Sequence, residues 1–300
     1  MRTVLASAAD ARYGFHLLSM IGSVQRNSDC FDEIVVYDLG LSPQQRRLVE
    51  SIRGVDLRPM PHFAPHWSQG FTWKPWIWTH LEAERIFYLD AGAMVMHSLE
   101  PVLEQIDELG YWVVSQGHES STLFPSSWYE LYGIDRARAE RHAVAAGIVG
   151  FRTEGRFWDD VVIPTYEDCL AGRNLGFSAH EVDRLNTALG HEEKPTLNDA
   201  RVFRWDQSVL NARLLLAYPD DLVVAGLDEY AGFRSPRDHP QQVIWSHRRR
   251  GDFRYLAKAR YSGAARLEAT ALALRLRGRI GLARARPLLR RLAGFRQAAG

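Results

Sequence analysis

The chain has few cysteines and no long apolar run. Only Cys30 and Cys169 occur among its 300 residues, which excludes a disulfide scaffold, and their spacing matches no metal-binding motif. No stretch of about 18 uncharged apolar residues is present, so the sequence predicts no membrane-spanning helix. The first ten residues reach Asp10 before an apolar segment of secretory length develops. These absences favour a cytoplasmic protein.

Several motifs of common enzyme classes are missing as well. The sequence contains no G-x-G-x-x-G and no Walker A pattern, which disfavours dinucleotide oxidoreductases and P-loop enzymes. A G-x-S-x-G nucleophile elbow is also missing. What is present is an ordinary globular composition with generous aromatics, nine Trp and eleven Tyr. Such aromatics fit a well-filled core and equally fit a cleft with aromatic walls for sugars and bases.

The net charge of +1 hides an asymmetry between the two ends of the chain. Residues 258–300 hold eleven Lys and Arg but a single acid, Glu268. The remaining residues are therefore mildly acidic. This change in composition predicts a main domain over residues 1–257 and a separate basic tail over residues 258–300.

The basic tail places leucines at helical spacing with arginines between them, beginning with Leu267, Ala271 and Leu274. A basic amphipathic helix is typical of a segment that lies on an anionic membrane surface. This interpretation places the protein peripherally at the inner membrane face, where it would meet a lipid-linked acceptor. Two alternatives stay open, a helix pair packed on the acidic body and a disordered segment. No nucleic-acid partner is expected.

Short apolar runs alternate with helical patterns along the first hundred residues, and further runs follow. The runs expected to form buried strands are Thr3–Ser7, Ile34–Tyr37, Arg85–Leu89, Tyr111–Val114, Ala143–Phe151 and Leu222–Val224. Helices are expected over Tyr13–Gln25, from Ser42 to about Ile52, and over Phe157–Cys169 and Trp205–Leu216. This alternation predicts an α/β, Rossmann-like domain with a mainly parallel central sheet flanked by helices. Ligands of such sheets bind at the carboxyl ends of the strands.

Asp90 is the strongest local candidate for chemistry. It directly follows the apolar run Ile86–Leu89 and precedes small residues that leave room for a bulky ligand. A sugar nucleotide needs its diphosphate charge balanced, commonly by a divalent ion held through acidic side chains. The plain alternative is an Asp that caps the next turn.

Six segments, in order along the chain, resemble those of glycosyltransferases with the GT-A fold. The likeness is to family 8, which includes glycogenin and bacterial lipopolysaccharide galactosyltransferases. The segments are Ala8–Tyr13, Trp73–Trp78, Tyr88–Gly92, Ala146–Gly150, Trp205–Asn211 and Ile244–His247. Each is weak alone, and Asp206-Gln207-Ser208-Val209-Leu210-Asn211 is the most specific.

The resemblance implies a role for each matched position. Asp206 and Gln207 would lie under the donor sugar as the catalytic pair. Asp90 would touch a divalent metal, Mn²⁺ or Mg²⁺, or the ribose, and His247 would reach the metal or the diphosphate. The donor, most commonly a UDP-sugar, would contact the remaining residues: Ala8, Asp10 and Tyr13 at the nucleoside, Lys74 at the diphosphate, and Gly92 and Gly147 near the sugar.

Two departures from the family pattern bear on the metal. Position 92 is Gly92, so the second acid of the D-x-D motif is missing. His247 is followed by Arg248, Arg249 and Arg250, whose guanidinium groups pair with phosphate bidentately. We therefore expect a transferase that needs metal weakly or not at all. The alternative for the three arginines is a solvated turn at a domain edge.

These observations predict a glycosyltransferase that moves a sugar from a nucleotide-sugar to a glycan, lipid-linked or other hydroxyl acceptor, with a role in cell-surface polysaccharide synthesis. A non-catalytic relative that binds sugar nucleotide or glycan remains an alternative, because of Gly92. A nucleotidyltransferase on a similar sheet is a third, although no glycine-rich, basic phosphate loop follows the first strand.

Overall fold

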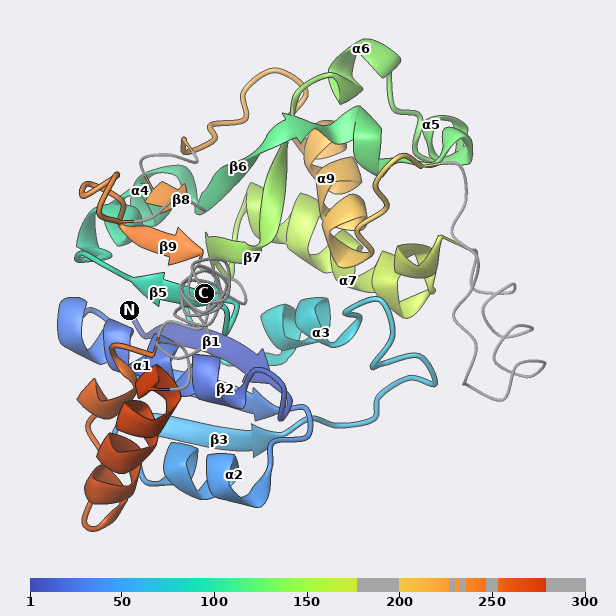
Figure 1. The fold of residues 1–300 in the computed structure, drawn as a ribbon. Helices are drawn as coiled ribbons and strands as arrows, with labels where there is room; N and C mark the ends of the chain where they lie inside the picture. Colours follow the sequence, from blue (N-terminus) through green and yellow to red (C-terminus); the bar gives the residue numbers. More distant parts are fainter. Residues whose placement is uncertain (177–199, 227–229, 233–235, 247–252, 279–300) are drawn as a thin grey trace, which may run out of the picture.

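A six-stranded sheet forms the centre of the molecule (Figure 1). The computed structural model describes residues 1–176, 200–226, 230–232, 236–246 and 253–278. The strands of the sheet are, in chain order, β1 (Thr3–Ala9), β2 (Glu33–Asp38), β3 (Val55–Pro59), β4 (Arg85–Leu89), β6 (Tyr111–Glu119) and β7 (His142–Arg152). Their spatial order is β3-β2-β1-β4-β7-β6.

The first four strands run parallel, which confirms the expected βαβ organisation. Strand β7 then pairs with β4 in the antiparallel sense, and Leu89 at the end of β4 lies opposite Ile148. This reversal brings the middle of β7 to the carboxyl end of β4. Residue Asp90, just beyond β4, consequently donates its backbone N–H to the carbonyl of Gly147, at 2.8 Å.

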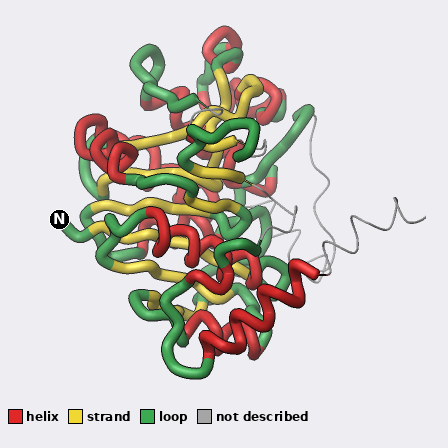
Figure 2. Tube along the Cα trace, turned by 60° about the vertical axis from the view of Figure 1, so that its left-hand side comes forward, coloured by secondary structure: helices red, strands yellow, loops and turns green. Residues whose placement is uncertain are grey.

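Helices cover both faces of the sheet, as the two side views show (Figures 1 and 2). Alternate residues of the buried strands face opposite layers: Leu5 and Phe87 enter one core cluster, whereas Val4 and Tyr88 enter another. The first layer contains α1 (Gly14–Asn27), α2 (Pro43–Glu50) and α4 (Glu100–Leu109), and the second contains α3 (Trp73–His80), α7 (Ile163–Leu170) and α9 (Asp206–Ala217).

Local sequence signals explain where several of these helices begin. The Ser42 side chain accepts from the backbone N–H of Gln45, and the Gln45 side chain accepts from the backbone N–H of Ser42, so α2 begins with a full capping box. Pro43 fits the first helical position, because an N–H at that position would have no partner within the helix.

Between β6 and β7 lie two short helices, α5 (Ser126–Tyr132) and α6 (Arg136–Ala139).

A second, three-stranded sheet joins early and late parts of the chain. Strand β5 (Ala93–Val95) pairs antiparallel with β9 (Ile244–Ser246), which pairs with β8 (Ala231–Gly232). Ser246 lies opposite Ala93, three residues beyond Asp90. The late strand therefore ends beside the loop that follows β4.

The start of the basic tail packs on the first helical layer. A helix over residues 265–278 buries Ala269, Leu272 and Ala273 in the core cluster that contains α1. Figure 2 shows this helix running along the outside of the body. The division at residue 257 thus rests on composition, and the later leucines of the predicted tail, in residues 279–300, lie outside the described residues. No helix of the described residues is long and apolar enough to cross a bilayer.

Candidate active site

The carboxyl end of β4 and the first turn of α9 meet at one buried lysine. The Nζ atom of Lys74, in the first turn of α3, lies 3.4 Å from Asp90 Oδ1 and 3.2 Å from Asp206 Oδ2. The side chains of Lys74 and Asp206 are 6% and 4% exposed, whereas that of Asp90 is 48% exposed. Three separate elements therefore share one ion-pair cluster, of which Asp90 is the solvent-facing member.

Aromatic rings surround the ammonium group of Lys74. Its Nζ atom lies 5.3–5.8 Å from the ring centroids of Phe71, Trp73 and Tyr88. The hydroxyl of Tyr88 donates to Asp90 Oδ1 at 3.1 Å. Burial, followed by the negative charge of Asp90, holds the pKa of Tyr88 well above its usual value, so the phenol stays protonated as a donor. This geometry fixes the carboxylate of Asp90 from two sides.

Burial also shapes the acidity of the paired groups. Burial away from water has the largest effect on the pKa of Asp206 and raises it to about 6, although the positive charge of Lys74 opposes the rise. For Lys74 burial alone would lower the pKa, but the charges of Asp206 and Asp90 outweigh it and the pKa is raised. Lys74 is therefore a cation at neutral pH, and Asp206 is mostly ionised there.

Asp206 owes its position to an unusual turn. The preceding residue, Trp205, has φ +49° and ψ −115°, so α9 begins abruptly at Asp206. A carboxylate in the first turn of a helix is stabilised by the exposed backbone N–H groups there. Its Oδ2 atom meets no donor in good hydrogen-bond geometry within the described part of the chain, and the ammonium of Lys74 is the charge that compensates it.

The next turn of α9 is fastened to the start of β7. The amide nitrogen of Gln207 donates to the carbonyl of Val144 at 2.8 Å. Asn211 accepts from the backbone N–H of Val144 at 2.8 Å and donates to its carbonyl at 3.1 Å. The Asp-Gln-x-x-x-Asn spacing thus places Asp206 at the cluster while Gln207 and Asn211 bind the sheet. The resemblance alone did not indicate that role for Asn211.

Gly147 is required by the close approach of Asp90. A Cβ atom at position 147 would lie 2.1 Å from Asp90 Oδ2, a distance at which the carboxylate must move. Gly92, the second glycine in the predicted site, is half-buried and lies in the turn between β4 and β5.

The predicted nucleoside residues lie at the carboxyl end of β1. Asp10 Oδ1 accepts the backbone N–H groups of Arg12 and Tyr13, at 3.0 and 3.1 Å, which shapes the turn into α1. Ala8 is buried in the sheet, and Tyr13 is half-buried beside the first core cluster. Strand β1 neighbours β4, and Ser7 Oγ donates to the carbonyl of Leu89 at 2.7 Å. The two strand ends therefore share one edge of the sheet.

The part of the predicted site carried by His247, Arg248, Arg249 and Arg250 lies outside the described residues. Within the described residues, no group of three His, Cys, Asp or Glu side chains could hold a metal ion. Position 92 carries glycine instead of a second acid, and the carboxylate of Asp206 is paired with Lys74. The donor set of the described residues therefore does not fit a divalent ion.

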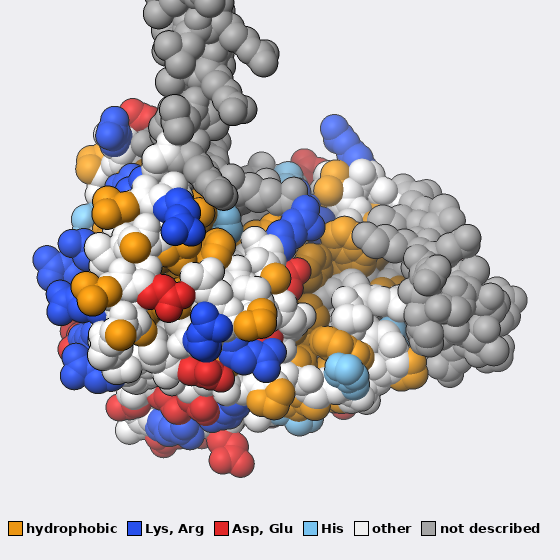
Figure 3. All heavy atoms as spheres, turned by 60° about the horizontal axis from the view of Figure 1, so that its bottom comes forward, with side chains coloured by type: hydrophobic (Ala, Val, Ile, Leu, Met, Phe, Trp, Pro, Cys, Tyr) orange, Lys and Arg blue, Asp and Glu red, His pale blue; other side chains and the backbone are white. Residues whose placement is uncertain are grey.

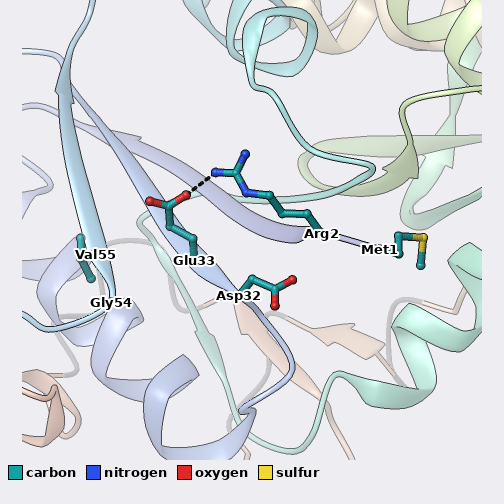
Figure 4. A pocket seen from close by; sticks show the side chains of 6 residues that line it. All are labelled: Met1, Arg2, Asp32, Glu33, Gly54 and Val55. Carbon is teal, nitrogen blue, oxygen red and sulfur yellow. Dashed lines mark hydrogen bonds and ion pairs between the residues drawn. The ribbon is translucent and has the colours of Figure 1, made fainter.

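A hollow elsewhere on the surface is not a second candidate. It measures about 620 Å³ and is lined by residues around Met1, Arg2, Asp32 and Gly54 (Figure 4). These residues mark the amino ends of the strands, and Arg2 pairs there with Glu33 at 2.6 Å. Ligands of open α/β sheets bind at the opposite edge, where the Lys74 cluster lies.

Comparison with models of known families and with curated proteins gives no match. Among solved structures, the apo form of the bifunctional glycosyltransferase WbbM matches 90% of this chain, with 11% sequence identity and a TM-score of 0.51. The fold is GT-A. The chain spans 51% of the WbbM chain, about half its length. Its six-stranded order with the reversed β7 is thus the GT-A sheet, and the Lys74 cluster occupies the carboxyl edge of that sheet.

Two further structures are similar at lower scores. The galactosyltransferase LgtC, in complex with donor and acceptor sugar analogs, matches 81% of this chain and 86% of its own, with 14% identity and a TM-score of 0.43. Mouse xyloside xylosyltransferase 1, in its apo form, matches 82% of this chain and 96% of its own, with 9% identity and a TM-score of 0.46.

Proposed function

We propose that this protein is a glycosyltransferase that moves a sugar from a nucleotide-sugar donor, a UDP-sugar, to a hydroxyl group of a glycan or lipid-linked acceptor. One observation carries the proposal: Lys74 joins Asp90 of β4 to Asp206 of α9 at the carboxyl edge of a GT-A sheet. These are the strand-end and helix-start positions that the family resemblance assigned to the donor. Cell-surface polysaccharide synthesis is the process that such a reaction would serve.

The proposed reaction needs charge stabilisation more than covalent help. The bond between the anomeric carbon and a diphosphate oxygen breaks, the acceptor oxygen bonds to that carbon, and the acceptor proton passes to the released nucleoside diphosphate. Positive charge grows at the anomeric carbon as the bond breaks. The ionised carboxylate of Asp206 would stabilise that charge, and Gln207, whose amide nitrogen is held by Val144, would offer its amide oxygen to a donor hydroxyl.

The donor would lie along the strand ends. Asp10 and Tyr13 would hold the base and ribose next to Ala8, and the sugar would reach the cluster past Gly92 and Gly147. Because Lys74 is almost fully buried, its ammonium would act on the donor through Asp90 and Asp206. The diphosphate would be bound by His247 and Arg248–Arg250, and we propose that these cations make a divalent metal unnecessary.

A donor-hydrolysis screen tests this function. Purified protein is incubated with UDP-, GDP- and dTDP-sugars, and the released nucleotide is measured. We expect release with one donor, and loss of release in Asp206→Ala and in Gln207→Ala. Tight binding of the donor without turnover would instead favour the non-catalytic relative. Formation of nucleotidyl products with release of pyrophosphate would favour a nucleotidyltransferase.

An acceptor embedded in a membrane suits the outer face of the helix over residues 265–278. Leu267 is 76% and Leu274 is 65% exposed, opposite the face that packs on the body. Arg266, Arg275 and Arg277 are exposed on the same helix. We therefore propose that this face meets anionic lipid, which localises the enzyme to the inner membrane face.

Vesicle flotation tests the proposed lipid contact. We expect binding to vesicles that contain phosphatidylserine and loss of binding in Leu267→Asn/Leu274→Asn. The matched control is Leu131→Asn, since Leu131 is 53% exposed on α5. Equal flotation of all three proteins would contradict the proposal.

A further inference from the structure

Two residues beside the Lys74 cluster have a backbone conformation that side chains rarely adopt. Phe71 has φ +58° and Trp205 has φ +49°, and no other non-glycine residue of the described part of the chain has a positive φ. Bulky side chains rarely take this conformation, and such outliers persist where the surroundings impose them. They flank the site in sequence, three residues before Lys74 and one before Asp206.

The two outliers also touch each other. The rings of Phe71 and Trp205 lie 5.5 Å apart between centroids at an angle of 75°, an edge-to-face pair. Two unusual backbone turns, one from each side of the cluster, therefore meet through their side chains. The result is a single aromatic unit that joins the start of α3 to the start of α9.

Rigid neighbours hold the Phe71 turn in place. Asn174 donates to the carbonyl of Gly70 at 3.0 Å and to the hydroxyl of Thr72 at 2.7 Å, on both sides of Phe71. Gly70 itself has φ +52°, and a Cβ atom there would lie 2.8 Å from Leu175. The turn is thus fixed by the buried Asn174 and packed against its neighbours.

The fixed turn leaves Phe71 partly exposed to solvent. Phe71 is 42% exposed, and the centroid of its ring lies 5.3 Å from the ammonium nitrogen of Lys74. An outward-facing ring in an unfavourable backbone conformation does not add to the packing of the core. It can instead bind a ligand, because flat apolar rings pack against the C–H faces of sugars. The space-filling view shows hydrophobic side chains gathered in a recess beside the undescribed residues (Figure 3).

We propose that the Phe71–Trp205 pair is the stacking platform for a sugar ring of the acceptor. The inference rests on the proposed transferase function. Asp10 and Tyr13 lie in the turn from β1 into α1, a helix of the first layer, whereas Phe71 and Trp205 precede α3 and α9 of the second layer. If the donor extends from Tyr13 to Asp206, the platform lies just past the donor sugar. The attacking hydroxyl of the acceptor must approach from that side. The acceptor is therefore a saccharide and not a bare lipid alcohol or a protein side chain.

The variant Phe71→Asn separates the contribution of the aromatic ring from that of the backbone turn. Asparagine tolerates a positive φ better than phenylalanine does, so this variant keeps the turn and removes the stacking surface. Phe71→Tyr keeps a ring of the same shape, and Leu131→Asn removes an exposed apolar side chain far from the cluster in sequence. We expect Phe71→Asn to unfold at a temperature no lower than the parent protein.

Saturation-transfer NMR on the full chain with UDP present gives the direct readout. The probes are lactose, maltose, methyl β-galactoside and methyl α-glucoside. We expect transfer to the C–H protons of at least one probe in the parent protein, in Phe71→Tyr and in Leu131→Asn, and its loss in Phe71→Asn. No transfer to any probe in the parent protein, or equal transfer in Phe71→Asn, would overturn the platform.

Kinetics separates the platform from the proposed function. In Phe71→Asn the KM for the saccharide acceptor should rise by about tenfold, while the KM for the donor should change much less. An equal rise in the KM for the donor would place Phe71 at the donor and overturn the proposal. If the parent protein hydrolyses no donor, the transferase function fails by itself, and the NMR result still decides whether the platform binds sugar.

Discussion

The ammonium of Lys74 lies 3.2 Å from Asp206 and 3.4 Å from Asp90, so one buried cation is shared by two carboxylates from different parts of the chain. Only Asp90 of the three reaches solvent to a substantial extent. The stability of the fold and the proposed chemistry therefore depend on the same ion pairs.

Replacing Lys74 should lower the free energy of unfolding more than replacing a surface cation. Lys74→Met leaves Asp206 buried without a counter-charge, which is expected to cost about 3–5 kcal/mol in the free energy of unfolding. Urea denaturation measures this loss. The control is Arg156→Met, whose pair with Asp221 is exposed at both ends and should contribute little to stability. Similar losses in the two variants would contradict the proposed strength of the cluster.

The pKa of Asp206 predicts a pH dependence of stability. The folded pKa, about 6, is above the ordinary value of 3.8, so the folded state binds more protons between these values. The contribution of Asp206 to stability is therefore largest below pH 4 and falls as the pH rises to 6, by about 3 kcal/mol at most. In Asp206→Asn this fall should disappear. Thermal denaturation at a series of pH values would show it, and parallel curves for both proteins would be evidence against it.

The same ionisation should govern the rate. If the carboxylate form of Asp206 stabilises the transition state, kcat for donor hydrolysis rises with pH through about 6. Initial rates from pH 4.5 to 8 in buffers of constant ionic strength measure the profile. A rate that is flat across pH 6 would exclude Asp206 from that role.

Gly147→Ala should impair activity without comparable loss of stability. The new methyl group would displace the carboxylate of Asp90, which a Cβ atom would approach to 2.1 Å, and a shift of that size at a reacting group costs on the order of 100-fold in rate. The matched control is Gly278→Ala, because no atom lies within 4 Å of a Cβ atom there. Full activity in Gly147→Ala would mean that the position of Asp90 is unimportant.

Chelation tests whether the enzyme works without a divalent metal. Catalytic metals supply several kcal/mol of charge stabilisation, so their removal slows a dependent enzyme by more than about 100-fold. We expect the rate to stay within about twofold in EDTA, since Gly92 removes one expected ligand and Lys74 already pairs with Asp206. Loss of activity in EDTA with recovery in Mn²⁺ would refute this expectation.

The sequence predicted the buried strands well because their apolar runs are continuous: β1, β2, β4 and β7 all lie where expected. It missed β3, whose residues 55–59 are half-buried or exposed at the edge of the sheet and lack that signal. The strand expected at Leu222–Val224 was wrong. Residues 222–224 form no ladder, and Ala225, directly after them, makes a single bridge to Val114.

The sequence singled out the residues of the Lys74 cluster but not their arrangement. Order along the chain pointed to Lys74, Asp90 and Asp206, but no local pattern shows that the lysine is buried between the two acids. That arrangement depends on how α3, β4 and α9 pack. Phe71 carried no sequence signal at all, because its positive φ comes from the fold around it.

The pairing of β5 with β9 has a consequence for the order of events during synthesis. Ribosomes release the chain from its amino end at about 5–20 residues per second, so β1–β4 emerge long before α9 and β9. Until those segments leave the exit tunnel, Lys74 has no Asp206 to neutralise and the loop after Asp90 has no neighbouring strand. The buried ion pairs of Lys74 and the pairing of β5 with β9 are therefore completed only after residue 246 has been synthesised.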